Sequence, residues 1–211
     1  MDLQSLITAF FTMFVIIDPV GLAPLFVALT TGTDARHRRA VAFRAIAVSA
    51  GVLLLFGLFG EAVLGFAGIS MPAFRIAGGV LLFLTALDML FERRTKRRED
   101  QASQSQADDH SPDDPSVFPL ATPLIAGPGS IASVILLTGQ AGTPLETVAV
   151  FAVVGLVLLL VLLFFLAGGL LERVLGPTGI NVVTRLLGML LAALSVQFVI
   201  DGLREMGALS Y

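Results

Sequence analysis

Residues 150–171 read VFAVVGLVLLLVLLFFLAGGLL, a run that contains no charged residue. A helix needs about 20 predominantly apolar residues to cross the hydrocarbon core of a membrane. Five further stretches of the chain are apolar enough to qualify. The six expected spans cover approximately residues 3–30, 42–67, 70–91, 117–139, 145–171 and 181–203. The sequence therefore predicts an all-α membrane protein with six transmembrane helices.

The composition agrees with a lipid environment. Apolar residues make up 56% of the 211 residues and charged residues 14%, whereas soluble domains have about 45–50% apolar residues, glycine included, and about 25% charged residues. A soluble fold of this size still exposes much of its surface, so it has too little interior for so many apolar side chains. The net charge of −3 leaves no basic face for nucleic acid. These numbers exclude a soluble enzyme and a nucleic-acid-binding protein, and they make the lipid bilayer the expected surroundings.

The charged residues gather in one loop, residues 92–116, which holds 12 of them. This loop lacks the apolar residues that would stabilise a fold, so we expect a flexible linker between two three-helix units, residues 1–91 and 117–211. Of the 13 Lys and Arg residues, 11 fall in or beside the first, third and fifth loops. Positive residues favour the cytoplasmic side, which predicts a cytoplasmic linker and places both termini outside.

The two halves of the chain resemble each other. Residues 18–25 read DPVGLAPL and residues 122–129 read TPLIAGPG, with both prolines separated by the same 104 positions. An Arg-x-x-Gly sequence also recurs at residues 75–78 and 185–188. Because each half has three spans, the second half must enter the membrane from the opposite side. The sequence therefore predicts two inverted three-helix repeats, an architecture of many secondary transporters.

The paired prolines predict that spans one and four are broken near mid-membrane. A proline inside a helix removes one backbone hydrogen bond and clashes with the preceding turn. We expect an unwound stretch between the prolines of each pair, with Pro24 and Pro128 as the first residues of second half-helices. The start of such a helix attracts a carboxylate, and unwound carbonyls accept from an ammonium group. This pattern favours a small zwitterionic solute as ligand; the alternative is that the prolines only kink the spans.

The candidate substrate-binding residues come from these two segments: Asp18, Pro19, Gly21, Thr122, Pro123, Gly127, Gly129 and Ser130. Asp18 is the one carboxylate expected near the middle of a span. A charge there is costly and usually faces a cavity or a partner, so Asp18 is the candidate for binding an ammonium group or carrying a coupling proton. The alternative is that its side chain caps the second half-helix.

Three further polar residues are expected to support the site. Arg75 and Arg185 lie in the first turns of spans three and six, where they either extend to the membrane surface or pair with a carboxylate or helix-end carbonyl, since a cation opposes the dipole there. Gln197 either joins two helices or contacts substrate. We expect no catalytic residue, metal or cofactor, because the two histidines, His37 and His110, lie in loops and the chain has no cysteine. An intramembrane enzyme is therefore disfavoured.

These segments also resemble a known family. Residues 118–131 read FPLATPLIAGPGSI and resemble the span-four signature of the MarC family, also called the SnatA-like neutral amino acid transporter family. Asp18-Pro19 is similar to its Asn/Asp-Pro motif, and residues 69–79 and 179–188 resemble its remaining signatures. The resemblance implies a six-helix protein of the bacterial inner membrane. For some members it implies transport of small neutral amino acids, such as glycine and alanine, driven by protons.

The leading hypothesis is therefore a proton-coupled secondary transporter of small neutral amino acids that works by alternating access. An exporter or a channel for another small solute is the alternative. The sequence leaves open the direction of transport and the oligomeric state.

Overall fold

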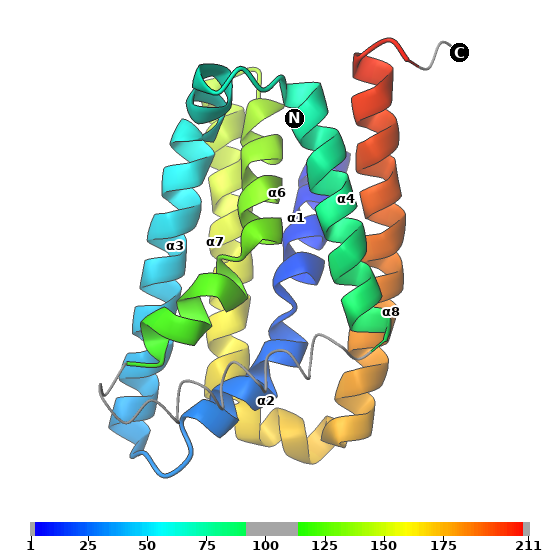
Figure 1. Cartoon of the computed structure of the whole chain (residues 1–211). Coiled ribbons are helices and arrows are strands. Elements are labelled where there is room, and N and C mark those ends of the chain that lie inside the picture. The colour runs from blue at the N-terminus through cyan, green and yellow to red at the C-terminus, as the bar shows by residue number, and fades with distance from the viewer. Residues whose placement is uncertain (1–2, 92–113, 209–211) are drawn as a thin grey trace.

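A computed structural model describes residues 3–91 and 114–208 (Figure 1). These residues form helices and no strand. The order is α1 (Leu3–Ile17), α2 (Pro19–Leu29), α3 (Ala35–Phe66), α4 (Met71–Leu90), η1 (Ser116–Ile125), α6 (Pro128–Gly139), α7 (Pro144–Leu166) and α8 (Gly168–Glu205). Most of the expected linker, residues 92–113, lies outside the described part of the chain.

Five stretches are long and apolar enough to cross a membrane: α1 with α2, α3, α4, α7, and Arg173–Glu205 of α8. The pair η1 and α6, which is bent by 57° between its two parts, makes a sixth candidate span. The expectation of an all-α, multi-pass membrane protein is therefore confirmed.

Two helices extend further than the apolar stretches predict. Helix α3 begins at Ala35 rather than near residue 42, because Asp34 caps it: the Asp34 Oδ1 accepts from the backbone N–H of His37 at 2.7 Å. Helix α8 begins at Gly168 rather than near residue 181, and it continues through a break at Gly176, where φ is 62°. Hydropathy marks only the part of a helix that lies in lipid, so it underestimates helices that continue into water.

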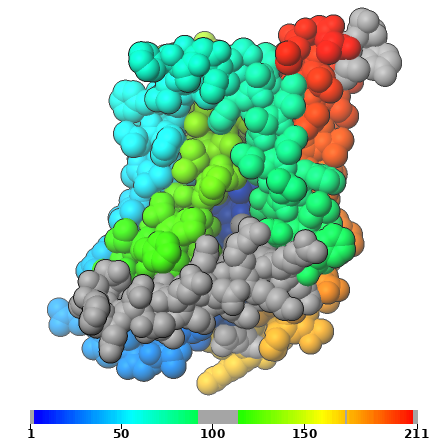
Figure 2. Space-filling model, viewed as in Figure 1, coloured from blue at the N-terminus to red at the C-terminus, as the bar shows by residue number. Residues whose placement is uncertain are grey.

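The broken span formed by α1 and α2 occupies the centre of the bundle. In the apolar stretch of α1 and α2, 61% of residues are buried, compared with 22–39% for α3, α4, α7 and α8. Figure 2 shows dark-blue α1 only through a gap between α6 and α4. The outer helices carry exposed apolar side chains, such as Leu58 and Phe59 of α3. Irregular backbone is tolerated at membrane depth only where protein surrounds it, and the fully buried break at Asp18 satisfies this requirement.

Corresponding helices of the two halves run in opposite directions. Helix α1 starts at the end of the bundle where α8 stops, and α6 runs back toward that end (Figure 1). The pairs α3 and α7, and α4 and α8, are opposed in the same way. We call the end that holds the start of α1 and the end of α8 the terminal end. The start of α1 and the end of α8 therefore lie on one side of the bundle.

Helices α4 and α8 pack closely because glycines face the contact. A Cβ atom added to Gly79 would lie 2.8 Å from the backbone oxygen of Ser195 and 2.8 Å from Val199 Cγ2. A Cβ added to Gly202 of α8 would lie 3.0 Å from the Pro72 oxygen. Small residues of this kind let helix backbones approach in membranes, where van der Waals packing drives association.

A Gly79→Ala substitution is expected to destabilise the fold by about 1–3 kcal/mol, the usual cost of overpacking. Thermal unfolding in detergent measures the effect as a lower Tm. Gly155→Ala in α7 is the matched control, because a Cβ there has no atom within 4 Å and the helix gains about 0.5–1 kcal/mol from losing a glycine. Equal Tm values for the two variants would contradict the close α4–α8 contact.

Candidate functional site

The first break is a single residue, Asp18, between α1 and α2. Its backbone is left-handed (φ 58°, ψ 68°), a conformation that Asp tolerates better than most residues. Its Oδ1 accepts from the backbone N–H of Gly21 at 3.0 Å, so the side chain caps α2. The residue is fully buried. The capping role considered from sequence is confirmed, and it places a carboxyl group in the interior of the bundle.

The expected unwound stretch between Pro19 and Pro24 is not present. Helix α2 begins at Pro19, and Pro24 lies inside it rather than at the start of a half-helix. Pro19 suits the first helical position because its fixed φ is already helical and its missing N–H would have no partner there. Together with the Asp18 cap, Pro19 starts α2 five residues earlier than Pro24 predicts.

The second break is longer and ends at Gly127. Within η1, Phe118 and Thr122 are extended (φ −126° and −127°). Each precedes a proline, which disfavours helical backbone in the residue before it. Helix α6 then begins at Pro128, as the sequence predicts. The Ser130 hydroxyl donates to the Ile125 carbonyl at 2.8 Å and so joins the two sides of this break.

The two breaks approach each other at Gly129. A Cβ added to Gly129 would lie 3.4 Å from Ile16 Cγ2, two residues before Asp18, and 3.3 Å from Leu82 Cδ2. The start of α6 therefore lies against the end of α1. The breaks differ in chemistry, because a carboxylate caps α2 whereas no side chain of residues 3–91 or 114–208 caps α6. One break presents a carboxyl group, and the other presents the uncapped start of a helix.

The remaining candidate residues are distributed around these breaks. Pro19 and Gly127 are buried, whereas Gly21 is half-buried. Thr122 and Pro123 are half-buried in η1, and α3 is the main neighbour of that segment. The structure thus brings α6 against the Asp18 break more directly than it brings the η1 residues there.

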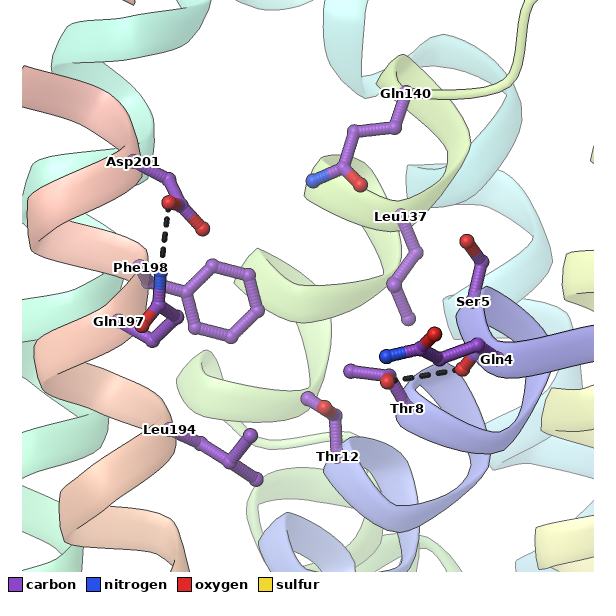
Figure 3. Close-up of a pocket in the computed structure, with 10 residues that line it drawn as sticks. All are labelled: Gln4, Ser5, Thr8, Thr12, Leu137, Gln140, Leu194, Gln197, Phe198 and Asp201. Carbon is purple, nitrogen blue, oxygen red and sulfur yellow. Dashed lines mark hydrogen bonds between the residues drawn. The ribbon is translucent and has the colours of Figure 1, made fainter. Parts of the chain in front are cut away.

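A polar cavity of about 260 Å³ opens between α1, α6 and α8 near the terminal end. Its lining residues are Gln4, Ser5, Thr8 and Thr12 of α1, Leu137 and Gln140 at the end of α6, and Leu194, Gln197, Phe198 and Asp201 of α8 (Figure 3). Thr12 is fully buried and lies six residues before Asp18, about 9 Å along a helix at 1.5 Å per residue. The cavity therefore extends from the terminal end toward the first break.

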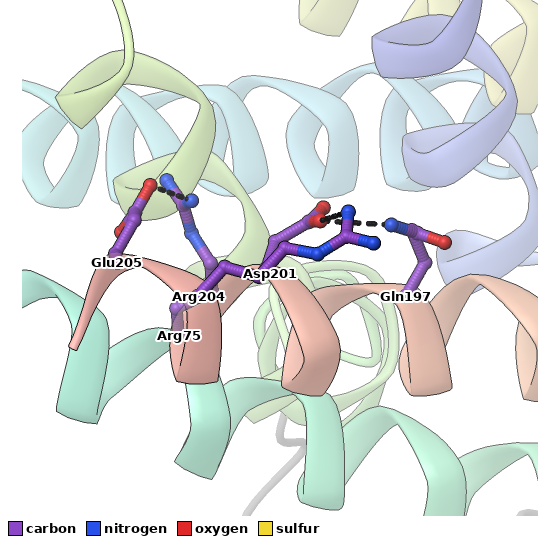
Figure 4. Close-up of polar contacts among 5 residues, drawn as sticks. All are labelled: Arg75, Gln197, Asp201, Arg204 and Glu205. Atoms are coloured by element: carbon purple, nitrogen blue, oxygen red, sulfur yellow. Dashed lines mark hydrogen bonds and ion pairs between the residues drawn. The ribbon is translucent and has the colours of Figure 1, made fainter. Parts of the chain in front are cut away.

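The supporting residues divide into two groups. Arg75 of α4 is buried and forms an ion pair with Glu205 of α8 (Figure 4), so pairing with a carboxylate, rather than extension to the membrane surface, describes it. Arg185 is not in the first turn of a helix. Helix α8 begins at Gly168, and residue 185 lies about two turns after the break at Gly176.

Gln197 does not join two helices. Its Nε2 donates to Oδ1 of Asp201, one turn further along α8, at 2.8 Å. Gln197 and Asp201 both face the cavity, so the substrate-contact interpretation of Gln197 stays a prediction. Asp201 lies near the end of the sixth expected span, and the sequence analysis did not include it among the site residues.

Sequence reasoning also missed the polar wall of α1. Gln4, Thr8 and Thr12 repeat at every fourth position of an otherwise apolar span, and this spacing places them on one helix face. That periodicity was the available signal. It does not identify the partner helices, because the Gln140 and Asp201 walls come from distant parts of the chain.

Comparison with known proteins gives the same family over nearly the whole chain. The sequence profile for MarC family integral membrane proteins matches residues 3–207. A UPF0056 membrane protein of Methanocaldococcus jannaschii is 39% identical, with 97% of this chain and 98% of that protein covered. The UPF0056 membrane protein YvbG of Bacillus subtilis is 34% identical (98% and 97% covered), and the inner membrane protein YhgN of Escherichia coli is 30% identical (96% and 98% covered). No solved structure matches the chain. The chain belongs to the MarC family of integral membrane proteins.

Proposed function

We propose that the protein is a proton-coupled secondary transporter of small neutral amino acids, such as glycine and alanine, in the bacterial inner membrane. The proposal includes alternating access, with substrate and protons as the partners and with no enzymatic activity or cofactor. The positive residues of the odd loops support an orientation in which the terminal end faces outside.

The approach of the two breaks is the observation that carries the proposal. A zwitterion needs a negative group for its ammonium and a positive group for its carboxylate. The Asp18 carboxylate supplies the first. The uncapped start of α6, which packs against Ile16, supplies the second through backbone N–H groups and the positive end of the helix dipole. Gly129 in the first turn of α6 lets Ile16 of α1 and Leu82 of α4 pack close to the backbone at the start of this helix.

The arrangement of the helices supports the alternating-access part of the proposal. Corresponding helices of the two halves are opposed in direction (Figure 1), as two inverted repeats would be. In such transporters, one repeat or bundle moves against the other around a site near the middle of the membrane. The close α4–α8 pair joins the last span of each half, and it is a candidate for the part that moves as one unit.

Asp18 is the proposed proton carrier. In the proposed cycle the substrate ammonium and the coupling proton use the same buried carboxyl group, so their binding would be linked at this residue. A transporter needs such linkage for a proton gradient to drive substrate movement.

Counterflow in proteoliposomes tests the function. Vesicles that contain the protein and a high concentration of unlabelled glycine are expected to accumulate labelled glycine transiently above equilibrium, because a carrier exchanges the two pools. Protein-free vesicles are the control, and ethylamine and acetate replace glycine to test whether both charges are needed.

A channel would equilibrate labelled glycine without this overshoot. The absence of overshoot with glycine, alanine and other neutral amino acids would contradict the proposed function. Overshoot with acetate but not with glycine would support a carrier function and contradict the assignment of amino acids as substrates.

A further inference from the structure

The cavity at the terminal end is polar where a helix bundle in lipid is normally apolar. It is separated from the two breaks by the Thr12 turn of α1. Its volume of about 260 Å³ lies just below the range of about 300–1,000 Å³ that drug-sized ligands occupy. The cavity therefore suits a small solute with polar groups.

The α8 wall of this cavity is negative. Among the described residues, Asp201 is the one ionisable residue that lines it, and no Lys or Arg does. The Asp201 Oδ1 takes the hydrogen bond from Gln197 at 2.8 Å, and an Arg204 nitrogen lies 3.8 Å from the same oxygen (Figure 4). Both contacts use Oδ1, so among the described residues Oδ2 is left for a ligand. The Asp201 side chain is 40% exposed, so its carboxylate is able to accept hydrogen bonds from an ammonium group.

The opposite wall is neutral and rich in hydrogen-bonding groups. The side chains of Gln4 on α1 and Gln140 at the end of α6 extend toward the α8 wall (Figure 3). Each amide carries two donor hydrogens and an acceptor oxygen. The amides can therefore bind a carboxylate group without a charged side chain.

The bottom of the cavity contains an unpartnered polar atom. Thr12 is fully buried, and its hydroxyl has no hydrogen-bond partner in the described part of the chain. Threonine in a membrane helix commonly bonds to a carbonyl of its own helix, as Thr8 does to Gln4, so Thr12 is an exception. A buried hydroxyl without a partner costs stability, and a ligand in the cavity would supply the missing bond.

We propose that this cavity is a second amino acid site, which we call the outer site, separate from the site between the breaks. Asp201, positioned by Gln197, binds the ammonium group; Gln4 and Gln140 bind the carboxylate; and Thr12 contacts the end of the solute that faces Asp18. The inference rests on the proposed function for the identity of the ligand. It adds that substrate is selected for its ammonium group before it reaches the breaks.

Protection from a thiol reagent tests the outer site locally, because the natural chain has no cysteine. A Thr8→Cys variant carries its single thiol on the exposed part of the cavity wall. Glycine at ten times its Kd is expected to slow labelling about tenfold, since about one site in eleven is then empty. Leu145→Cys in the first turn of α7 is the matched control, because this residue is 77% exposed and lies outside the cavity.

Second substitutions in the Thr8→Cys background identify the groups involved. Asp201→Asn is expected to abolish protection by removing the charge while keeping the size of the side chain. Glu61→Gln, which removes an exposed carboxylate on α3, is expected to leave protection unchanged. Asp18→Asn is expected to retain protection, because glycine still reaches the outer site when the site between the breaks is impaired.

Counterflow of the same preparations separates this inference from the proposed function. Protection that survives Asp201→Asn, or that disappears with Asp18→Asn, would overturn the outer site. If counterflow is normal in the same preparations, the proposed transport function would still stand. Protection that depends on Asp201 in a protein without counterflow would support the outer site and overturn transport. Protection by ethylamine equal to that by glycine would overturn the assignment of a carboxylate-binding wall.

Discussion

An Asp18→Asn variant is expected to remain folded and to lose proton-driven glycine uptake. Asparagine adopts the left-handed conformation of residue 18 almost as readily as aspartate, and it caps helices about equally well. The bond to the Gly21 N–H is therefore retained. What the variant removes is the carboxyl group that the proposed mechanism uses for the ammonium group and the proton. Uptake of labelled glycine into proteoliposomes under an imposed pH gradient measures the loss.

Asp18→Ala is expected to fail in two ways. Alanine loses the cap, at a cost of about 1 kcal/mol, and holds the left-handed conformation at a further cost of about 1–2 kcal/mol. Its Tm should fall below that of Asp18→Asn, while uptake is lost in both. The difference between the two variants separates the structural role of Asp18 from its role in coupling.

Asp34→Asn provides the matched control, since Asp34 caps α3 in the same manner but is exposed. It should retain both stability and uptake. Wild-type uptake by Asp18→Asn at all pH values would leave Asp18 as a cap alone and would remove the proton carrier from the mechanism.

The chain contained enough information to predict the spans and the position of both breaks. Runs of about 20 apolar residues have few uses other than crossing a membrane. In both Asp18-Pro19 and Gly127-Pro128, the first residue favours the end of one helix and the proline favours the start of the next. The details of the first break were not predictable from proline spacing alone. Pro24 continues α2 because neighbouring helices compensate for a lost backbone bond inside a bundle, whereas the Asp18 cap decides where the helix begins.

The cavity depends on tertiary contacts that no single segment encodes. Thr12, Gln140 and Asp201 come from three different helices, with 128 positions between the first two and 61 between the last two. Each also has an ordinary local explanation, as a helix hydroxyl, a helix end or a surface carboxylate. Only the packing of α1 against α6 and α8 places them around one space. Arg185 was misplaced because α8 begins at Gly168, before the apolar stretch that was expected to start near residue 181.

An aromatic pair lies at the opposite end of the bundle. The ring of Phe26 on α2 stacks on that of Phe165 on α7 with centroids 4.4 Å apart and planes at 2°. Both residues are fully buried, and the Arg38 guanidinium lies 5.7 Å from the Phe26 ring. Helix α2 and the end of α7 lie at the end away from the cavity (Figure 1). In an alternating-access transporter that is open at the terminal end, a closed gate is required there.

Phe165→Ala is therefore expected to make proteoliposomes leak. Vesicles loaded with labelled glycine should lose it only at the turnover rate of the carrier with the wild-type protein, and should lose it much faster with the variant if the Phe26–Phe165 pair seals this end. Truncation of a buried Phe also costs about 3–5 kcal/mol of stability, so the assay must run well below the Tm of the variant. Phe165→Leu keeps most of the bulk and should restore retention.

Phe11→Ala separates sealing from the general loss of an aromatic ring. Phe11 is 50% exposed on α1, so its removal changes contact with lipid and not the closed end. It should leave retention at the wild-type level. A folded Phe165→Ala protein that retains glycine as the wild type does would show that the Phe26–Phe165 pair is packing alone. The barrier that alternating access requires would then have to lie elsewhere, between the pair and Asp18.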